Sequence, residues 1–397
     1  MNRIGVVAAV GITLALGALS TACRDEPVAP TQATSTTIRA DLNSGPRHAG
    51  RIVTFDVPGA GTAAGQGTQP NSINAAGTIT GTYVDGDNVT HGLLRAPDGR
   101  LTTIDAPGAG TAAGQGTQAP GINSVGAIAG FYVDGGNVAH GFLRAPHGRF
   151  TTVDVPHAQV TTTWSINSDG TTAGLIIDAD GVWHGLVRAP DGRLTIFDAP
   201  GAGTGPWQGT WIGAGCCINP AGTITGSYIG ADNVWHGYVR APHGAITEFD
   251  VPGAAGQGTV SWSINPEGAV TGYYMDASGV THGFLRAPHG RLTTIDVPGA
   301  GTSAGQGTTA GAIDPAGVIS GYYVDGSGVS HGFVRRPDGK ISTFDVPGAG
   351  TGPGQGTFPQ NIGPTGAVPG YYVDGSGVTH GFLWTPEPDH QLAAGSR

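Results

Sequence analysis

Seven histidines, each followed by a glycine, are the first residues whose type and spacing could do chemistry. They recur every 44 to 52 residues, at His91, His140, His184, His236, His282, His331 and His380. Imidazole nitrogens ligate transition metals, form hydrogen bonds and exchange protons near neutral pH. The roles to compare are therefore a metal centre, an acid–base site and a structural hydrogen bond.

Tryptophans that interrupt the repeated pattern are the second kind of candidate. Six of the seven lie between residues 164 and 262. An aromatic face buries a large apolar area and an indole N–H donates a hydrogen bond, which suits the binding of sugar rings. Packing into gaps between shorter loops is the alternative interpretation. The predicted ligand-binding residues are four tryptophans and two asparagines: Trp164, Trp207, Trp211, Trp262, Asn167 and Asn265.

The unit around each histidine predicts four short strands. Residues 263–298 show its parts: Ser-Ile-Asn-Pro-x-Gly, an alternating apolar run, an Asp-x-x-Gly turn, the His-Gly run, an Ala-Pro-x-Gly turn and a last run that ends in Asp-Val-Pro. β-Branched and aromatic residues bounded by Gly, Pro, Asn and Asp are typical of strands joined by tight turns. Four strands in a unit of about 40 to 50 residues are typical of a β-propeller blade.

Residues 51–386 contain seven such units, so we predict an all-β, seven-bladed β-propeller with four-stranded blades. The repeat begins with a fourth-strand sequence at residues 51–58 and ends after a third-strand sequence near Trp384. If the N-terminal strand pairs with the C-terminal blade, the ring closes and no strand edge stays exposed. A solenoid does not need a repeat that starts with a fourth strand and ends after a third strand, so we rank a solenoid behind the propeller.

This architecture argues against a metal shared between the histidines. A third strand lies about 10 Å outward from the first, so equivalent histidines of neighbouring blades would be roughly 15 Å apart. Zinc ligands lie about 2.0 to 2.1 Å from the metal. We therefore predict no metal, no cofactor and a structural role for all seven histidines. The expected partners are the aspartates that follow the fourth strands: Asp56, Asp105, Asp154, Asp198, Asp250, Asp296 and Asp345.

Two further motifs predict loops and no ligand. The Asp-x-x-Gly turns supply too few oxygens for calcium, which takes six to eight. The Gly-Gln-Gly-Thr segments, such as residues 305–308, lack the lysine and the helix start of a phosphate loop. We expect these segments to be flexible loops between blades.

The His-Gly-Phe and His-Gly-Leu runs resemble the probable extracellular repeat proteins of the HAF family. That family is named after a His-Ala-Phe motif, in which glycine replaces alanine here, and His236 is followed by Gly-Tyr. The resemblance implies an extracytoplasmic β-repeat protein. It brings no settled activity.

The N-terminal residues predict secretion and lipid attachment. Residues 1–22 combine Arg3, an apolar run and small residues, which is typical of a signal peptide. The sequence before Cys23 resembles a bacterial lipoprotein cleavage box, which implies that Cys23 is lipidated; ordinary signal cleavage is the alternative. Residues 23–50 predict a disordered tether and residues 387–397 a disordered tail. The expected location is extracytoplasmic and lipid-anchored, at the outer membrane or cell surface.

Cys216 and Cys217 are adjacent and lie in the longest unit. Together with Cys23 they are too few for a disulfide framework. In an oxidising compartment they would form a vicinal disulfide or stay as two buried thiols. The sequence leaves both outcomes open.

The amino-acid composition limits the classes of molecule that the chain could bind. The chain has a formal net charge of −10, a single lysine and no basic cluster along the sequence, which argues against nucleic acid. We expect a monomer that contacts the membrane through its lipid and binds a glycan or cell-surface polymer. The leading hypothesis is a binding or adhesion module with carbohydrate at the mouth of the central channel. A polysaccharide lyase or hydrolase and a purely structural scaffold are the alternatives, which fold alone does not separate.

Overall fold

The computed structural model describes residues 37–38, 50–213 and 216–387. The signal peptide, Cys23, most of the tether and the tail from residue 388 lie outside these residues. The described chain consists of strands joined by turns and loops, so the all-β prediction is confirmed. No helix within it is long and apolar enough to cross a membrane.

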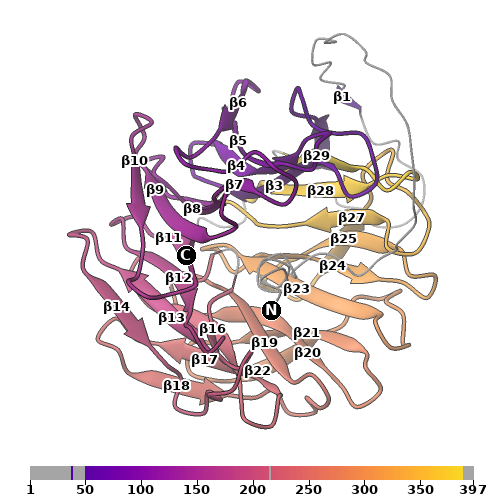
Figure 1. The fold of residues 1–397 in the computed structure, drawn as a ribbon. Coiled ribbons are helices and arrows are strands. Elements are labelled where there is room, and N and C mark those ends of the chain that lie inside the picture. Colours follow the sequence, from indigo (N-terminus) through magenta and orange to yellow (C-terminus); the bar gives the residue numbers. More distant parts are fainter. Residues whose placement is uncertain (1–36, 39–49, 214–215, 388–397) are drawn as a thin grey trace, which may run out of the picture.

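The strands from β2 onward form seven antiparallel groups of four, arranged around a common centre as in a β-propeller (Figure 1). We number these groups as blades 1 to 7 along the chain. The first strands lie nearest the centre; they are β3 (Gly67–Ile73), β7 (Gly116–Ile122), β11 (Val160–Ile166), β15 (Gly209–Trp211), β19 (Thr259–Ile264), β23 (Gly307–Ile313) and β27 (Gly356–Pro359). The second strands are β4 (Ile79–Val84), β8 (Ile128–Val133), β12 (Thr172–Ile177), β16 (Ile224–Ile229), β20 (Val270–Met275), β24 (Ile319–Val324) and β28 (Val368–Val373).

The third strands carry the His-Gly runs, and the fourth strands form the outer edges of the blades. The third strands are β5 (Thr90–Arg95), β9 (Ala139–Arg144), β13 (Trp183–Arg188), β17 (Trp235–Arg240), β21 (Thr281–Arg286), β25 (Ser330–Arg335) and β29 (Thr379–Pro386). The fourth strands are β6 (Leu101–Ile104), β10 (Phe150–Val153), β14 (Leu194–Phe197), β18 (Ile246–Phe249), β22 (Leu292–Ile295), β26 (Ile341–Phe344) and, for blade 7, β2 (Gly50–Phe55).

The fourth strand of blade 7 comes from the other end of the described chain. β2 pairs with β29 along its whole length, from Gly50 opposite Pro386 to Phe55 opposite Gly381. The short strand β1 (Thr37–Ile38) pairs with the other edge of β2. Blade 7 also contacts blade 1 directly, through a parallel bridge between the first residue of β29 and the first residue of β3.

The residue after each His-Gly pair builds the core of its blade. Phe284, Phe333 and Phe382 are fully buried. The glycine before each of them makes room for its close neighbours, which for Gly332 and Gly381 include an aromatic ring of the fourth strand: a Cβ on Gly332 would lie 2.8 Å from the ring of Phe344, which faces it across the ladder. The repeated motif is therefore a packing requirement of the blade.

Hydrophobic clusters fill the layers between neighbouring blades. Phe55 and Val57, at the end of blade 7, pack against Ile73, Ile79 and Leu93 of blade 1. The same arrangement recurs between blades 5 and 6. Burial of each such side chain stabilises the fold by roughly 1.5 to 3 kcal/mol. The stability of one blade thus depends on the presence of the next.

A pair of truncations tests the role of β2. A chain that begins at Asp56 should unfold at a much lower temperature than one that begins at Gly50, because it loses the buried side chains of Ile52 and Phe55 and exposes the edge of β29. We expect a loss of at least about 4 kcal/mol, measured by thermal unfolding in circular dichroism. Equal melting temperatures would contradict a stabilising role for β2.

Candidate functional site

The alternation of strand directions places the connections on two faces of the ring. The long-loop face carries the turns between second and third strands and the loops between blades, which are residues 85–89 and 105–115 in the first repeat. The tight-turn face carries the turns between first and second strands and between third and fourth strands, which are residues 74–78 and 96–100. The two sets of connections lie at opposite ends of the strands.

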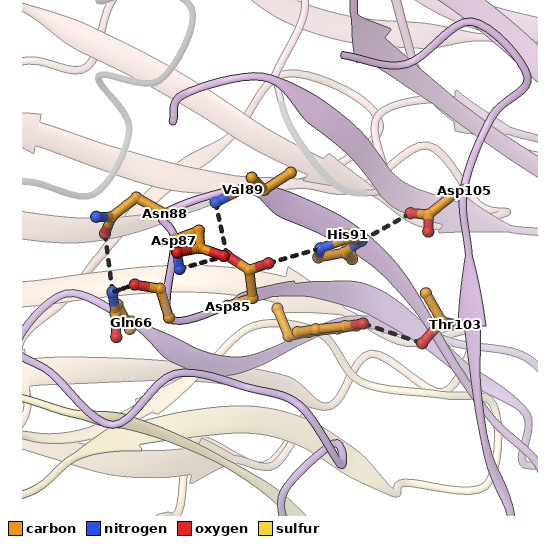
Figure 2. Close-up of polar contacts among 10 residues, drawn as sticks. Gln66, Asp85, Asp87, Asn88, Val89, His91, Thr103 and Asp105 are labelled. Carbon is orange, nitrogen blue, oxygen red and sulfur yellow. Dashed lines mark hydrogen bonds and ion pairs between the residues drawn. The ribbon is translucent and has the colours of Figure 1, made fainter. Parts of the chain in front are cut away.

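A histidine links two connections on the long-loop face of each blade (Figure 2). In blade 1 the Nδ1 atom of His91 lies 3.0 Å from Asp105, and its Nε2 atom lies 3.2 Å from Asp85. The other carboxylate oxygen of Asp85 accepts hydrogen bonds from the backbone N–H groups of Asp87 and Val89, at 2.9 and 2.8 Å. The imidazole therefore ties the fourth-strand end to the turn before the third strand.

The same bridge recurs in all seven blades. The Nδ1 atoms lie 2.7 to 3.0 Å from the fourth-strand aspartates that the sequence indicated. The Nε2 atoms lie 3.2 to 3.6 Å from a second carboxylate. Sequence reasoning missed these second partners, although an aspartate precedes every histidine at a nearly constant spacing: Asp85, Asp134, Asp178, Asp232, Asp276, Asp325 and Asp374.

Tyrosine rings cover the imidazoles in six of the blades. In blade 1, Tyr83 faces His91 across the ladder and stacks on it, with ring centroids 4.8 Å apart and planes 18° apart. The hydroxyl of Tyr83 lies 3.0 Å from that of Thr103. In blade 3 the equivalent position is Ile176. Within the described residues, no group of histidine, cysteine and acidic side chains could hold a metal.

The bridging carboxylates raise the pKa of two of the histidines, His331 and His380. The hydrogen bond to Asp345 raises the pKa of His331 above its usual value, against the effect of burial, and Asp325 adds to the rise. The pKa of His380 is raised in the same way, by Asp56 first. Burial acts to raise the pKa of Asp325, but the backbone N–H groups of its turn and the histidine outweigh it, so the pKa is lowered. Both partners thus favour their charged forms.

Glutamines tie the loops between blades to the neighbouring turns. The amide of Gln66 donates hydrogen bonds to the carbonyl of Gly86 and to the side chain of Asn88, at 3.2 and 3.0 Å. The N–H of Gly65 donates to the carbonyl of Gly377 in blade 7, at 2.9 Å. These contacts hold the Gly-Gln-Gly segment that the sequence predicted to be flexible.

Two of the predicted ligand-binding tryptophans occupy bulges of first strands. Trp164 is buried, its indole N–H donates to the hydroxyl of Thr162 at 2.9 Å, and its ring lies 4.9 Å from that of Phe131. Trp262 is partly buried, with its ring 5.9 Å from that of Tyr273. The indole N–H of Trp164 is thus already satisfied within the protein.

The predicted asparagines lie on the tight-turn face. Asn167 and Asn265 are each 5% exposed, and each caps its own turn. Their amides belong to a belt of hydrogen bonds of 3.1 to 3.5 Å that links successive blades: Asn74 to Asn123, Asn123 to Asn167, Asn167 to Asn219, Asn219 to Asn265 and Asn265 to Asp314. The structure therefore separates these asparagines from the tryptophans of the long-loop face.

Four tryptophans gather on the long-loop face at blades 3 and 4. The ring of Trp235 lies 6.0 Å from that of Trp183 and 5.6 Å from that of Trp211. Trp207 precedes β15 and is 41% exposed. Trp207 and Trp211 were predicted from the sequence, whereas Trp183 and Trp235 were not, although both replace a small residue immediately before a histidine.

The two adjacent cysteines are free thiols in the structure. Cys216 of blade 4 lies 3.1 Å from the side-chain nitrogen of Asn361 in blade 7. The same nitrogen donates to the hydroxyl of Ser72 in blade 1. Cys217 is fully buried, which raises the pKa of its thiol to about 12. The long segment of blade 4 thus reaches across the centre of the ring.

No protein-family model matches this chain, and no curated protein matches its sequence. Among solved structures, it is similar to the BP39L lectin from Burkholderia pseudomallei, with 12% identity, 78% of this chain and 94% of that chain covered, and a TM-score of 0.48. It is also similar to TolB from Acinetobacter baumannii, with 9% identity, coverage of 89% and 79%, and a TM-score of 0.44. It is similar as well to a fucose-specific lectin from Aleuria aurantia, with 13% identity, 67% of this chain and 90% of that chain covered, and a TM-score of 0.38. The fold assignment rests on the strand pairing of this chain itself.

Replacement of one bridging histidine tests its structural role. The substitution His282→Ala should lower the stability by about 1 to 3 kcal/mol, because the contacts with Asp296 and Asp276 and the stacking on Tyr274 are lost. The control is His289→Ala, which removes an exposed histidine from a turn of the same blade. Thermal unfolding measures both, and equal melting temperatures would rule out the structural role.

The bridges also predict how stability depends on pH. Histidines with raised pKa contribute stability that is complete below their unfolded pKa and is lost as pH rises through the folded value. Aspartates with lowered pKa contribute stability that is complete above their unfolded pKa and is lost as pH falls. The melting temperature should therefore be highest between about pH 4 and 6.5. A maximum above pH 8 would contradict this account.

Proposed function

We propose that this chain is a non-catalytic module that binds neutral carbohydrate through the tryptophan cluster on its long-loop face. The observation that carries the proposal is the conformation of Trp207, whose φ is 67° and whose side chain is 41% exposed. Its backbone is held in place by a 2.9 Å hydrogen bond from its N–H to the carbonyl of Gly181.

The backbone conformation of Trp207 lowers the stability of the folded protein, whereas a glycine could adopt the same conformation without this cost. A left-handed backbone costs an L-residue roughly 1 to 2 kcal/mol. Five other blades place glycine at the equivalent position before Gln-Gly, always with positive φ: Gly65, Gly114, Gly256, Gly305 and Gly354. Blade 3 has Ala158 before its glutamine. Strained and exposed residues of this kind concentrate at functional sites. A bulky ring in a glycine position therefore supports a binding role.

The neighbours of Trp207 suit a sugar ring. Trp183, Trp211 and Trp235 provide adjacent aromatic faces at half-buried positions, and such faces pack on the apolar C–H surface of sugars. Gln208 and Asn233 add amide groups joined by a 2.9 Å hydrogen bond in an exposed position. Flat apolar rings beside amides are the combination that carbohydrate recognition needs.

The charge of the long-loop face favours a neutral ligand. Each blade contributes two aspartates of its histidine bridge to this face. Every lysine and arginine of the described residues lies at the opposite ends of the strands. Acidic glycans would be repelled here, because each blade places two carboxylates on this face against a single imidazole.

We further infer that the seven blades form a closed, monomeric ring that a lipid on Cys23 holds at the outer membrane or cell surface, as an adhesion module with repeats like those of the HAF family. The pairing of β2 with β29 and the bridge from Thr379 to Gly67 support closure. Cys23 lies outside the described residues, so the anchor is supported by the sequence pattern alone.

The substitution Trp207→Gly separates binding from stability. It restores the residue of five other blades, so the melting temperature should stay the same or rise, while affinity for a neutral glycan should fall by at least about tenfold. Calorimetric titration against a panel of neutral oligosaccharides measures the affinity, with the buried Trp164→Phe as the matched control. Unchanged binding by Trp207→Gly, or no binding of any neutral glycan, would overturn the proposal. Shortened glycan products after incubation would instead indicate the alternative, a polysaccharide-active enzyme.

A further inference from the structure

The tight-turn face concentrates the positive charge of the described chain. Arginines end the third strands, as Arg95 does in β5, and further basic residues follow the next turn, as Arg100 does. Arg51, the second residue of β2, lies at the same end. Acidic residues are fewer on this face, with Asp98, for example, at the tip of a turn. A chain with a net charge of −10 therefore presents one face rich in arginine.

Six arginines are recessed at equivalent positions of this face, one at the end of the third strand in each of blades 1 to 6: Arg95, Arg144, Arg188, Arg240, Arg286 and Arg335. In each case the Nη2 atom lies beside the glycine of the following turn, since a Cβ on that glycine would be 3.4 to 3.6 Å away. These glycines all have positive φ. The guanidinium groups thus lie along the turns of the tight-turn face.

Three of the recessed guanidinium groups stack on aromatic rings of the preceding blade. The guanidinium carbon of Arg95 lies 4.9 Å from the ring centre of Phe55, that of Arg240 lies 4.6 Å from Phe197, and that of Arg286 lies 4.9 Å from Phe249. Stacking of this kind fixes the plane of the guanidinium group. The fork of N–H donors is therefore already oriented before any ligand binds.

These arginines have no acidic partner among the described residues. The ion pairs of that part of the chain include none of the six. Arg95 and Arg240 are only 9% and 8% exposed, and the Nε–H groups of Arg95, Arg240 and Arg286 have no hydrogen-bond partner there. A buried cation without a partner costs several kcal/mol, so such groups are normally paired. Arg188, Arg240 and Arg335 each donate from Nη1 to the backbone carbonyl of the following residue, at 3.2, 3.4 and 3.4 Å. The Nε–H groups of Arg95, Arg240 and Arg286 stay as oriented cationic donors without a partner among the described residues.

We propose that the tight-turn face binds an acidic polysaccharide, whose carboxylate or sulfate groups accept hydrogen bonds from the recessed arginines. A planar guanidinium group matches two oxygens of either anion. Neighbouring arginines of the ring are roughly 15 Å apart, so one polymer reaches several of them and gains affinity from multivalency.

The surroundings favour a polysaccharide over a nucleic acid. Sequence-independent binding of single strands uses exposed aromatic rings on which bases stack. The large hydrophobic side chains exposed in the described chain are Val125, Val138, Ile196 and Trp207, and the one aromatic residue among them lies on the long-loop face. The phenylalanines beside the arginines are covered by the guanidinium groups themselves.

This second site is independent of the proposed neutral-glycan site, because it lies at the opposite ends of the strands and recognises charge. Binding of dextran sulfate and of uncharged dextran by the full-length protein tests it, with biolayer interferometry at low and high salt. Dextran sulfate should bind at least tenfold more tightly than dextran, and Trp207→Gly should leave this binding unchanged. Equal binding of the two polymers, or loss of dextran sulfate binding in Trp207→Gly, would overturn the proposal.

A charge-conserving variant tests the guanidinium fork. The combination Arg95→Lys, Arg240→Lys and Arg286→Lys keeps the net charge but removes the paired donors, so dextran sulfate binding should weaken at least fivefold. If this variant does not fold, Arg286→Lys alone should weaken binding about twofold at an unchanged melting temperature. Wild-type affinity in the variant that folds would exclude the arginines as the binding groups.

A pair of charge-matched variants tests the face. The exposed Arg100, Arg149 and Arg291 changed to Gln should weaken dextran sulfate binding at least fivefold. The control Ser278→Asp, Ser327→Asp and Ser376→Asp changes the net charge equally on the long-loop face, where blades 1 and 3 already carry Asp87 and Asp180; it should weaken binding less than twofold. Equal losses would show a non-specific charge effect. Tighter binding of single-stranded DNA than of dextran sulfate, lost in the arginine variant, would assign the face to nucleic acid instead.

Discussion

The contacts of the seven imidazoles with pairs of carboxylates hold the long-loop face together. Each bridge joins the end of a fourth strand to the turn before the third strand, and the turn aspartate also accepts hydrogen bonds from its own backbone. Glutamines extend these contacts to the loops between blades. Loops fixed in this way can contain a residue with a strained backbone, such as Trp207. The contacts that all blades share offset the free-energy cost of that conformation.

The same motif that supplies the bridge also supplies the core. After the histidine, glycine admits close neighbours, in several blades an aromatic ring of the fourth strand, and the next residue fills the centre of the blade. Each hydrophobic cluster lies between neighbouring blades, so an isolated blade would expose its apolar faces. In blade 7, β2 pairs with β29 and so covers the outer edge of that strand. Blades 3 and 4 can depart from the repeated sequence because the contacts between the other blades still stabilise the fold.

The two faces of the ring have opposite chemistry. The long-loop face carries the aspartates of the histidine bridges and a group of tryptophans, whereas the six recessed arginines of the tight-turn face form no ion pair within the described part of the chain. The first arrangement suits uncharged sugar rings and the second suits anionic groups on a polymer. Both proposed sites lie at positions where the pattern of the blades is repeated or interrupted.

Local periodicity was enough to predict the strands, the repeats and one of the two aspartate partners of each histidine. In blades 1 to 6 the two residues lie in one hairpin, as His282 and Asp296 do, whereas Asp56, the partner of His380, lies 324 residues away. The same reasoning placed Asn167 and Trp207 in one site, yet they lie on opposite faces, since a strand of seven residues separates its two ends. The contact of Cys216 with Asn361 joins residues that are distant in the chain. The arginines are scattered along the sequence and gather only in space. These features depend on how the blades are arranged around a common centre, which places residues that are far apart in the sequence side by side.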